Sequence, residues 1–161
     1  MNVIDLLTRL DGRINRKPYW IGSLLILGAA FAALVAVVAI WGDDALDGPY
    51  SGNSAMSLAI GWLIMLASVP VAVKRLHDLN RSGRYLWPIF ALEALLTAGD
   101  LSGVTGNETD PNALGWVLLG IYAMYALVLF IVLGFHRGTP GRNDFGPDPL
   151  APEEIPASVS L

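Results

Sequence analysis

The sequence predicts an all-α polytopic membrane protein with four transmembrane helices and both termini in the cytoplasm. Of its 161 residues, 54% are hydrophobic and only 15% are charged, whereas soluble domains carry about 25% charged residues. Four long segments are apolar and almost free of charge, and each is long enough to cross a bilayer as a helix. All ten lysines and arginines lie in connections or ends that this arrangement keeps inside the cell.

The predicted helices are apolar segments separated by short polar connections. They cover residues 19–41, 54–73, 85–104 and 113–135. The first carries no charge from Tyr19 to Trp41 and, at about 1.5 Å per residue, exceeds the ~30 Å hydrocarbon core. It is too long for a signal peptide, whose apolar region spans about 7–15 residues. In the second, Pro70 is expected to kink the last turn.

The third segment is the weakest of the four, because Glu93 lies in its middle. Six strongly apolar residues between Leu86 and Leu96 gain roughly 2–4 kcal/mol on insertion, and one carboxylate costs about 3 kcal/mol. A re-entrant segment is therefore the alternative to a full span. It would place the C-terminal arginines outside, which favours the full span.

The placement of charge sets the predicted topology. Basic residues occur in residues 9–17, 74–84 and 137–142, while residues 42–53 and 99–112 contain acidic residues and no basic ones. Basic connections stay on the cytoplasmic side. Four spans with both termini inside therefore place every lysine and arginine in the cytoplasm.

The domain organisation is simple. Residues 1–149 form one predicted membrane domain, and residues 150–161 are expected to be a disordered cytoplasmic tail. The N-terminal segment has apolar residues near one helical face, namely Val3, Ile4, Leu7 and Leu10. Two interpretations stay open for this segment: an amphipathic helix at the membrane interface, or a frayed terminus.

Polar residues cluster at the three predicted cytoplasmic boundaries. Retention of loops inside the cell needs only lysine and arginine, yet these clusters also hold His-Asp pairs, asparagines and turn-forming glycines. The candidate site residues of this layer are Arg13, Asn15, Arg16, Tyr19, Trp20, Arg75, His77, Asp78, Arg81, Gly83, Gly138, Asn143, Gly146 and Asp148. We expect the layer to organise the loops, with Asp78 pairing with Arg75, Arg13 or Arg16. The sharper interpretation is a binding site for an anionic lipid headgroup or phosphate group.

A small transporter or channel subunit is the alternative function. Glu93, Thr97 and Asp100 share one helical face, and carboxylates inside a membrane often mark ion or proton paths. Four helices are few for such a path. The expected partners are therefore membrane lipids, together with a homo-oligomer or another membrane protein.

Several function classes are disfavoured. The chain has no cysteine, which removes disulfides and thiolate chemistry, and a net charge of −4 disfavours a nucleic-acid partner. His77 and His136 are the only histidines, and with Asp78, Asp144 or Asp148 they match no metal-binding spacing. No catalytic motif is present, so we expect neither an enzyme nor a cofactor nor a metal site.

Three sequence blocks, GRINRKPYW, KRLHDLNRSGRYLW and GTPGRNDFGPDP, occur in this order with apolar segments between them. They resemble the signature blocks of the domain of unknown function 805 family, over about Leu10 to Pro149. Ile14-Asn15 departs from the Ser or Ala typical of that family's first block. The resemblance implies a four-helix protein of a bacterial inner membrane, and it implies no biochemical activity.

Overall fold

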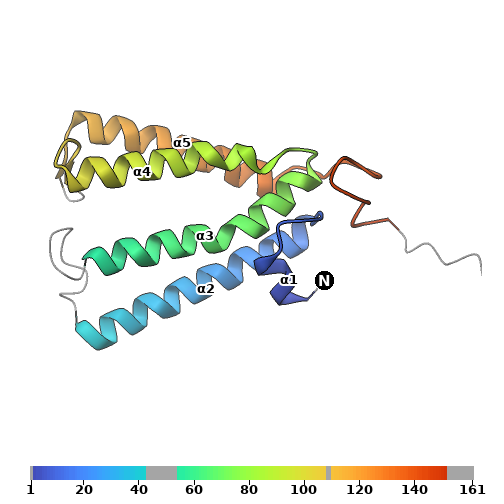
Figure 1. Ribbon diagram of the computed structural model, residues 1–161, viewed down its shortest axis with the longest axis horizontal. Coiled ribbons are helices and arrows are strands. Elements are labelled where there is room, and N and C mark those ends of the chain that lie inside the picture. The colour runs from blue at the N-terminus through green and yellow to red at the C-terminus, as the bar shows by residue number, and fades with distance from the viewer. Residues whose placement is uncertain (1, 43–53, 108–109, 152–161) are drawn as a thin grey trace, which may run out of the picture.

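The computed structural model describes residues 2–42, 54–107 and 110–151, and it is mostly helical. The elements in order are α1 (Val3–Thr8), α2 (Arg16–Trp41), α3 (Ser54–Asp78), the 3₁₀ turn η2 (Gly83–Leu86), α4 (Trp87–Leu101), β1 (Gly106–Asn107), β2 (Asp110–Pro111) and α5 (Ala113–Phe135). Figure 1 shows two pairs of neighbouring helices, α2 with α3 and α4 with α5. The pairs converge at the end where α1 lies and diverge toward the other end.

Within the described ranges, three helices are long and apolar enough to cross a membrane, and they lie in α2, α3 and α5. α4 has 15 residues, which at 1.5 Å per residue is about 22 Å and shorter than the ~30 Å hydrocarbon core. It packs along the spanning helix α5 (Figure 1). The predicted helical membrane fold is confirmed, while the fourth span and the cytoplasmic placement of the termini stay predictions.

The end of α3 differs from the one expected. The helix continues to Asp78 instead of ending at Val73, so the basic cluster expected in a loop forms its last turn. Cationic side chains are favourable there, at the negative end of the helix dipole. The helix stops where Asn80 adopts a left-handed conformation (φ 54°) and the Arg81 N–H donates to the Leu76 carbonyl at 2.8 Å.

The third apolar segment, expected as one helix over 85–104, is divided. η2 takes its first residues, and α4 begins at Trp87 with a proline in its first turn, where a missing N–H is tolerated. α4 ends at Leu101, and the short antiparallel pair β1–β2 connects it to α5. Pro70 lies inside α3, which changes direction along its length in Figure 1.

The buried core lies where the helices converge. Beside this core lie residues 9–17, 74–84 and 136–150, which we call the basic end. The apolar core residues are Leu6, Ile14, Tyr19, Val71, Leu76, Leu86 and Leu133. The expected disordered tail lies, from residue 152 onward, outside the described residues.

α1 is docked on the basic end through one buried lysine. The Lys74 ammonium group donates to the carbonyl oxygens of Asp5 and Leu6 at 2.6 and 2.7 Å, and the residue is 1% exposed. The Asp5 carbonyl also accepts a hydrogen bond from the Arg9 N–H, whereas the Leu6 carbonyl lies in the last turn, where a helix leaves carbonyl groups without intrahelical partners. Leu6 is buried, whereas Val3 and Ile4 are exposed. The N-terminal segment is therefore a helix in this structure.

Candidate functional site

A buried carboxylate, Asp78, lies between two arginine side chains at the basic end. Arg13 Nη2 is 3.1 Å from Asp78 Oδ1, and Arg75 Nη1 pairs with Asp78 Oδ2. The side chains of Arg13 and Arg75 are 1% and 0% exposed. A buried charge is tolerated only when it is paired and hydrogen-bonded. This Arg13–Asp78–Arg75 triad therefore fixes the loop before α2 against the last turn of α3.

The remaining donors of the two arginines bind the chain at and after the end of α5. Arg13 Nη2 donates to the Thr139 carbonyl at 2.6 Å. Arg75 donates to the Leu133 carbonyl at 2.8 Å and to the His136 carbonyl. The triad thus ties together three segments that lie far apart in the sequence.

The chain after α5 folds back against α3. The Thr139 N–H donates to the Asp78 carbonyl at 2.8 Å, and Asn143 Nδ2 donates to the His77 carbonyl at 2.9 Å. Gly138 passes so close to the triad that a Cβ atom there would lie 2.6 Å from Asp78 Cγ. Only glycine fits at this position without a shift of the buried carboxylate.

His77 contacts the loop before α2 and the segment after α5. Its Nδ1 lies 3.1 Å from the Gly12 carbonyl oxygen, and its ring stacks on Phe145 with centroids 3.9 Å apart. Gly146 has a positive φ of 136°, and its carbonyl accepts a hydrogen bond from Arg13 at 3.2 Å. In the part of the chain that the structure describes, no three His, Asp or Glu side chains are grouped as a metal site.

Tyr19 and Trp20 anchor the helices to one another. Tyr19 belongs to the buried core. Trp20 Nε1 donates to the Gly134 carbonyl at 3.2 Å, and its ring makes edge-to-face contacts with Phe130 and Phe135. These two candidates therefore position α2 against α5 above the loops.

Two further candidates, Arg81 and Gly83, lie apart from the triad. Arg81 Nη1 donates to the Tyr85 hydroxyl at 3.1 Å, and the arginine is exposed. A Cβ atom at Gly83 would lie 3.1 Å from Val73. Both residues support η2 and its contact with α3, and the structure does not bring them together with the other candidates.

A polar cavity of about 320 Å³ opens beside the triad, and we call it the basic-end cavity. Its lining residues are Asn15, Arg16, Arg75, Asp78, Arg137, Gly138, Thr139, Pro140, Asp148 and Leu150. The Asn15 side chain caps α2 by accepting a hydrogen bond from the Lys17 N–H at 3.0 Å, which fixes Arg16 in the first turn. Arg16 and Arg137 are exposed, and neither makes a hydrogen bond or ion pair with the described part of the chain.

Asp148 closes one side of the basic-end cavity. Its carboxylate oxygens accept hydrogen bonds from the N–H groups of Gly141 and Leu150, each at 2.9 Å. The N–H groups of Leu150 and Gly141 hold the pKa of Asp148 below its ordinary value, with smaller contributions from Arg13 and Arg137. Asp148 is therefore charged at neutral pH and orders the C-terminal segment.

Three residues of this end, Arg137, Thr139 and Lys74, are not singled out by sequence patterns. The prediction of topology uses only the number of basic residues in each connection, so it does not distinguish Arg137 and Lys74 from the other basic residues. Thr139 bonds to Arg13 and Asp78 through its backbone and its hydroxyl, and both partners lie too far away in the sequence for a local pattern to reveal the contact. The one usable signal is the place of Arg137, between a helix end and a glycine-rich block.

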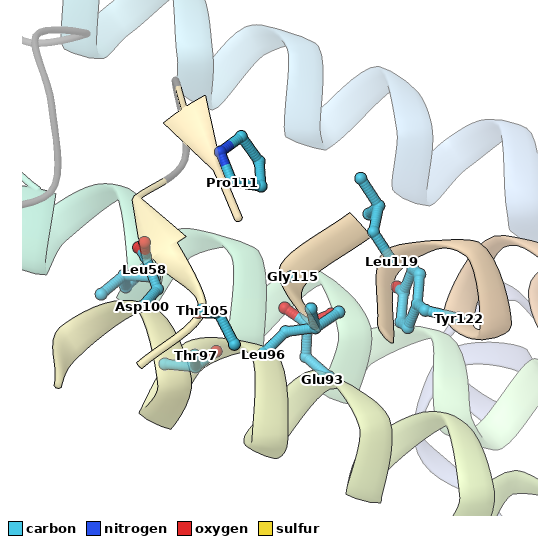
Figure 2. A pocket seen from close by; sticks show the side chains of 10 residues that line it. All are labelled: Leu58, Glu93, Leu96, Thr97, Asp100, Thr105, Pro111, Gly115, Leu119 and Tyr122. Carbon is cyan, nitrogen blue, oxygen red and sulfur yellow. The ribbon is translucent and has the colours of Figure 1, made fainter. Parts of the chain in front are cut away.

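A second candidate site lies inside the bundle at Glu93. A cavity of about 260 Å³ opens between α3, α4 and α5, and Figure 2 shows Glu93, Thr97 and Asp100 along one face of α4. Tyr122 of α5 lines this cavity together with Glu93. A second cavity, of about 510 Å³, also contacts Glu93 and Tyr122 and extends to Tyr19 at the basic end.

The family model described as "Protein of unknown function (DUF805)" matches residues 7–147. The chain belongs to this family. A relative, "Uncharacterized protein YiiR" of Escherichia coli (strain K12), is 29% identical over 150 residues, which cover 92% of this chain and 90% of the relative. No solved structure matches the chain. The family resemblance predicted from the three sequence blocks is confirmed.

Two other relatives carry a cellular location in their names. "Inner membrane protein YhaH" of Escherichia coli (strain K12) is 27% identical over 139 residues, or 86% of this chain and 84% of the relative. "Inner membrane protein YhaI" of the same organism is 27% identical over 151 residues, or 92% of each chain. With its apolar spanning helices, this DUF805 protein is an inner-membrane protein, as predicted, and its family description assigns no activity.

Proposed function

We propose that this DUF805 protein binds a phosphate group in the basic-end cavity, at the cytoplasmic face of the inner membrane. The phosphate belongs either to an anionic lipid headgroup or to a free phosphate. The observation that carries the proposal is the pair Arg16 and Arg137, two guanidinium groups that line one polar cavity and make no hydrogen bond or ion pair with the described residues. Guanidinium groups bind phosphate oxygens through paired, charge-assisted hydrogen bonds.

The triad has a different role in this proposal. Arg13 and Arg75 already use their donors on Asp78 and on backbone carbonyls, so a ligand on them would first have to break buried bonds. Arg16 and Arg137 can bind a ligand without such a loss. The triad therefore organises the loops and holds the cavity walls, while the exposed pair contacts the phosphate.

The positions of the two arginines suit a ligand at the membrane boundary. Arg16 is the first residue of α2, and Arg137 follows the end of α5 by two residues. Both helices are long and apolar enough to span the bilayer, which supports a position of these two residues at headgroup level. Basic residues near the cytoplasmic leaflet are attracted to its anionic lipids by about 1 kcal/mol each.

Lipid retention tests this proposal. The protein is reconstituted with anionic and zwitterionic lipids, extracted in mild detergent, and analysed by native mass spectrometry. The Arg16→Gln/Arg137→Gln double variant is expected to lose the retained anionic lipid. The matched Arg84→Gln/Arg142→Gln variant, which removes two exposed charges from the same end, is expected to keep it.

Equal lipid retention by the two double variants contradicts the proposal. An added arm separates the two phosphate sources, because inorganic phosphate displaces the lipid only if the cavity takes the free anion. If neither lipid nor inorganic phosphate binds the wild-type protein, the cavity is not a phosphate site.

A second function, passage of protons or small cations past Glu93, is favoured by one observation. The two internal cavities meet at Glu93 and Tyr122, so the carboxyl group borders space on both sides. Intramembrane carboxyl groups with such access serve as proton or ion relays. In liposomes loaded with a pH-sensitive dye, Glu93→Gln is expected to abolish protein-dependent flux, while the exposed Asp11→Asn change leaves it intact. Flux that survives Glu93→Gln contradicts this function.

A further inference from the structure

The charges around the basic-end cavity do not cancel. Among the residues that the structure describes, the charged groups that line it or pair with its lining are Arg13, Arg16, Arg75, Arg137, Asp78 and Asp148. Arginine does not lose its proton in proteins, and the N–H groups that bond to Asp148 favour its charged form. Burial raises the pKa of Asp78, and its ion pairs with Arg13 and Arg75 act in the opposite direction and favour the carboxylate. Four positive groups therefore face two negative ones, which leaves an excess of two positive charges.

We infer that the ligand of this cavity is a phosphate monoester or free phosphate, a dianion, rather than a phosphate diester, which carries one charge. The inference rests on the proposed phosphate binding. The second ionisation of a phosphate monoester has a pKa of about 6, so it carries close to two negative charges above neutral pH. Such a ligand neutralises the excess charge of the cavity completely, whereas a diester leaves one positive charge uncompensated.

The oxygen atoms of the ligand support the same choice. A monoester presents three strong acceptor oxygens, so the planar forks of Arg16 and Arg137 can each engage two of them and share one. A diester has two such oxygens for the same two forks. Neutral groups of the lining do not distinguish the two ligands by charge. The Thr139 hydroxyl already donates to the Asp78 carbonyl at 3.0 Å, and Asn15, whose side-chain oxygen caps α2, can donate its amide NH2 to either ligand.

The size of the cavity limits the rest of the ligand. Its volume of about 320 Å³ is at the lower end of the 300–1,000 Å³ that small-molecule pockets span. A bare phosphate on a lipid or on a small soluble molecule fits this space. A headgroup that adds a sugar or an inositol ring to the phosphate does not suit it.

Two lipids that differ by one methyl group test the inference. Phosphatidic acid carries a monoester, and phosphatidylmethanol is the same lipid with one phosphate oxygen methylated and one charge removed. Their dissociation constants are measured at pH 8 with the full-length protein in nanodiscs of neutral lipid. Phosphatidic acid is expected to bind about tenfold more tightly to the wild type and to Arg84→Gln/Arg142→Gln. For Arg16→Gln/Arg137→Gln the two constants are expected to become equal.

The outcomes separate this inference from the proposed function. Equal affinities in the wild type, both weakened by Arg16→Gln/Arg137→Gln, overturn the dianion inference and leave phosphate binding in place. If Arg16→Gln/Arg137→Gln binds both lipids as tightly as the wild type does, both the dianion inference and the proposed phosphate binding are overturned. Displacement of phosphatidic acid by inorganic phosphate assigns the site to a soluble monoester, and failure to displace it assigns the site to a lipid. Either assignment supports the inference when the tenfold preference holds.

Discussion

Replacing Asp78 by asparagine removes one charge from the centre of the basic end and changes almost no volume. In the wild type, the carboxylate compensates Arg13 and Arg75, whose side chains are 1% and 0% exposed. The Asp78→Asn variant leaves both guanidinium groups buried without a counter-charge. Breaking a buried ion pair by removing one partner costs about 3–5 kcal/mol. That cost shifts the folding equilibrium roughly a hundred- to several-thousand-fold.

The assay is reversible unfolding in mixed micelles with increasing sodium dodecyl sulfate, followed by tryptophan fluorescence. Trp20, packed on α5 at the basic end, reports on the region that the substitution affects. The matched control is Asp11→Asn, because Asp11 pairs with Arg9 at 3.0 Å with 71% of its side chain exposed. Exposed pairs are screened by solvent and contribute little. If Asp78→Asn destabilises the protein no more than Asp11→Asn does, the buried triad does not hold the loops together.

Three further changes probe other contacts of the basic end. Gly138→Ala forces a Cβ atom to 2.6 Å from Asp78 Cγ. In the same unfolding assay, this variant should lower the free energy of unfolding by about 1–3 kcal/mol. Gly120→Ala, which adds a Cβ atom in open space, should not destabilise the protein. Lys74→Met should release α1, seen as faster hydrogen exchange of residues 3–8, at a cost of about 1.5–3 kcal/mol for charge-assisted bonds. The pKa of Asp148 lies below its ordinary value. The contribution of its carboxylate to stability is therefore complete above about pH 4 and is lost as the pH falls through the lowered pKa. A spin label is attached at residue 147 through a single cysteine introduced into this cysteine-free chain. With Asp148 present, the label should gain mobility as the pH falls below about 4, and with Asp148→Asn it should show no such transition.

The membrane segments were predictable because a long run without charge can be recognised from the residues alone, with no knowledge of their tertiary contacts. The boundary of α3 was not, since charge patterns mark where a helix leaves the lipid and not where its hydrogen bonds end. Lys74 to Asp78 stay helical past that point because the left-handed Asn80 ends the helix only afterwards. Asn80 precedes an arginine and a serine, and nothing local distinguishes it from other loop asparagines.

The sequence predicts which residues make up the candidate site, but not which of them pair with one another and which face the cavity. The patterns name Asp78 and three possible arginine partners, and the structure pairs it with Arg13 and Arg75, leaving Arg16 to face the cavity. Arg13 and Asp78 are 65 positions apart, and their contact depends on how the whole bundle packs. Arg137 is a candidate only because the fold brings it to the same cavity as Arg16.

Contact between the phosphate and the two exposed arginines can be measured directly by solid-state nuclear magnetic resonance. Protein with ¹⁵N-labelled arginine is placed in bilayers that contain phosphatidic acid, and dephasing of the guanidinium signals by ³¹P is recorded. Dephasing is expected in the wild type and in Arg84→Gln/Arg142→Gln, and it should be lost in Arg16→Gln/Arg137→Gln. Dephasing that persists in Arg16→Gln/Arg137→Gln contradicts phosphate binding in the basic-end cavity. Dephasing that is absent from the wild type both with phosphatidic acid and with added inorganic phosphate contradicts it as well.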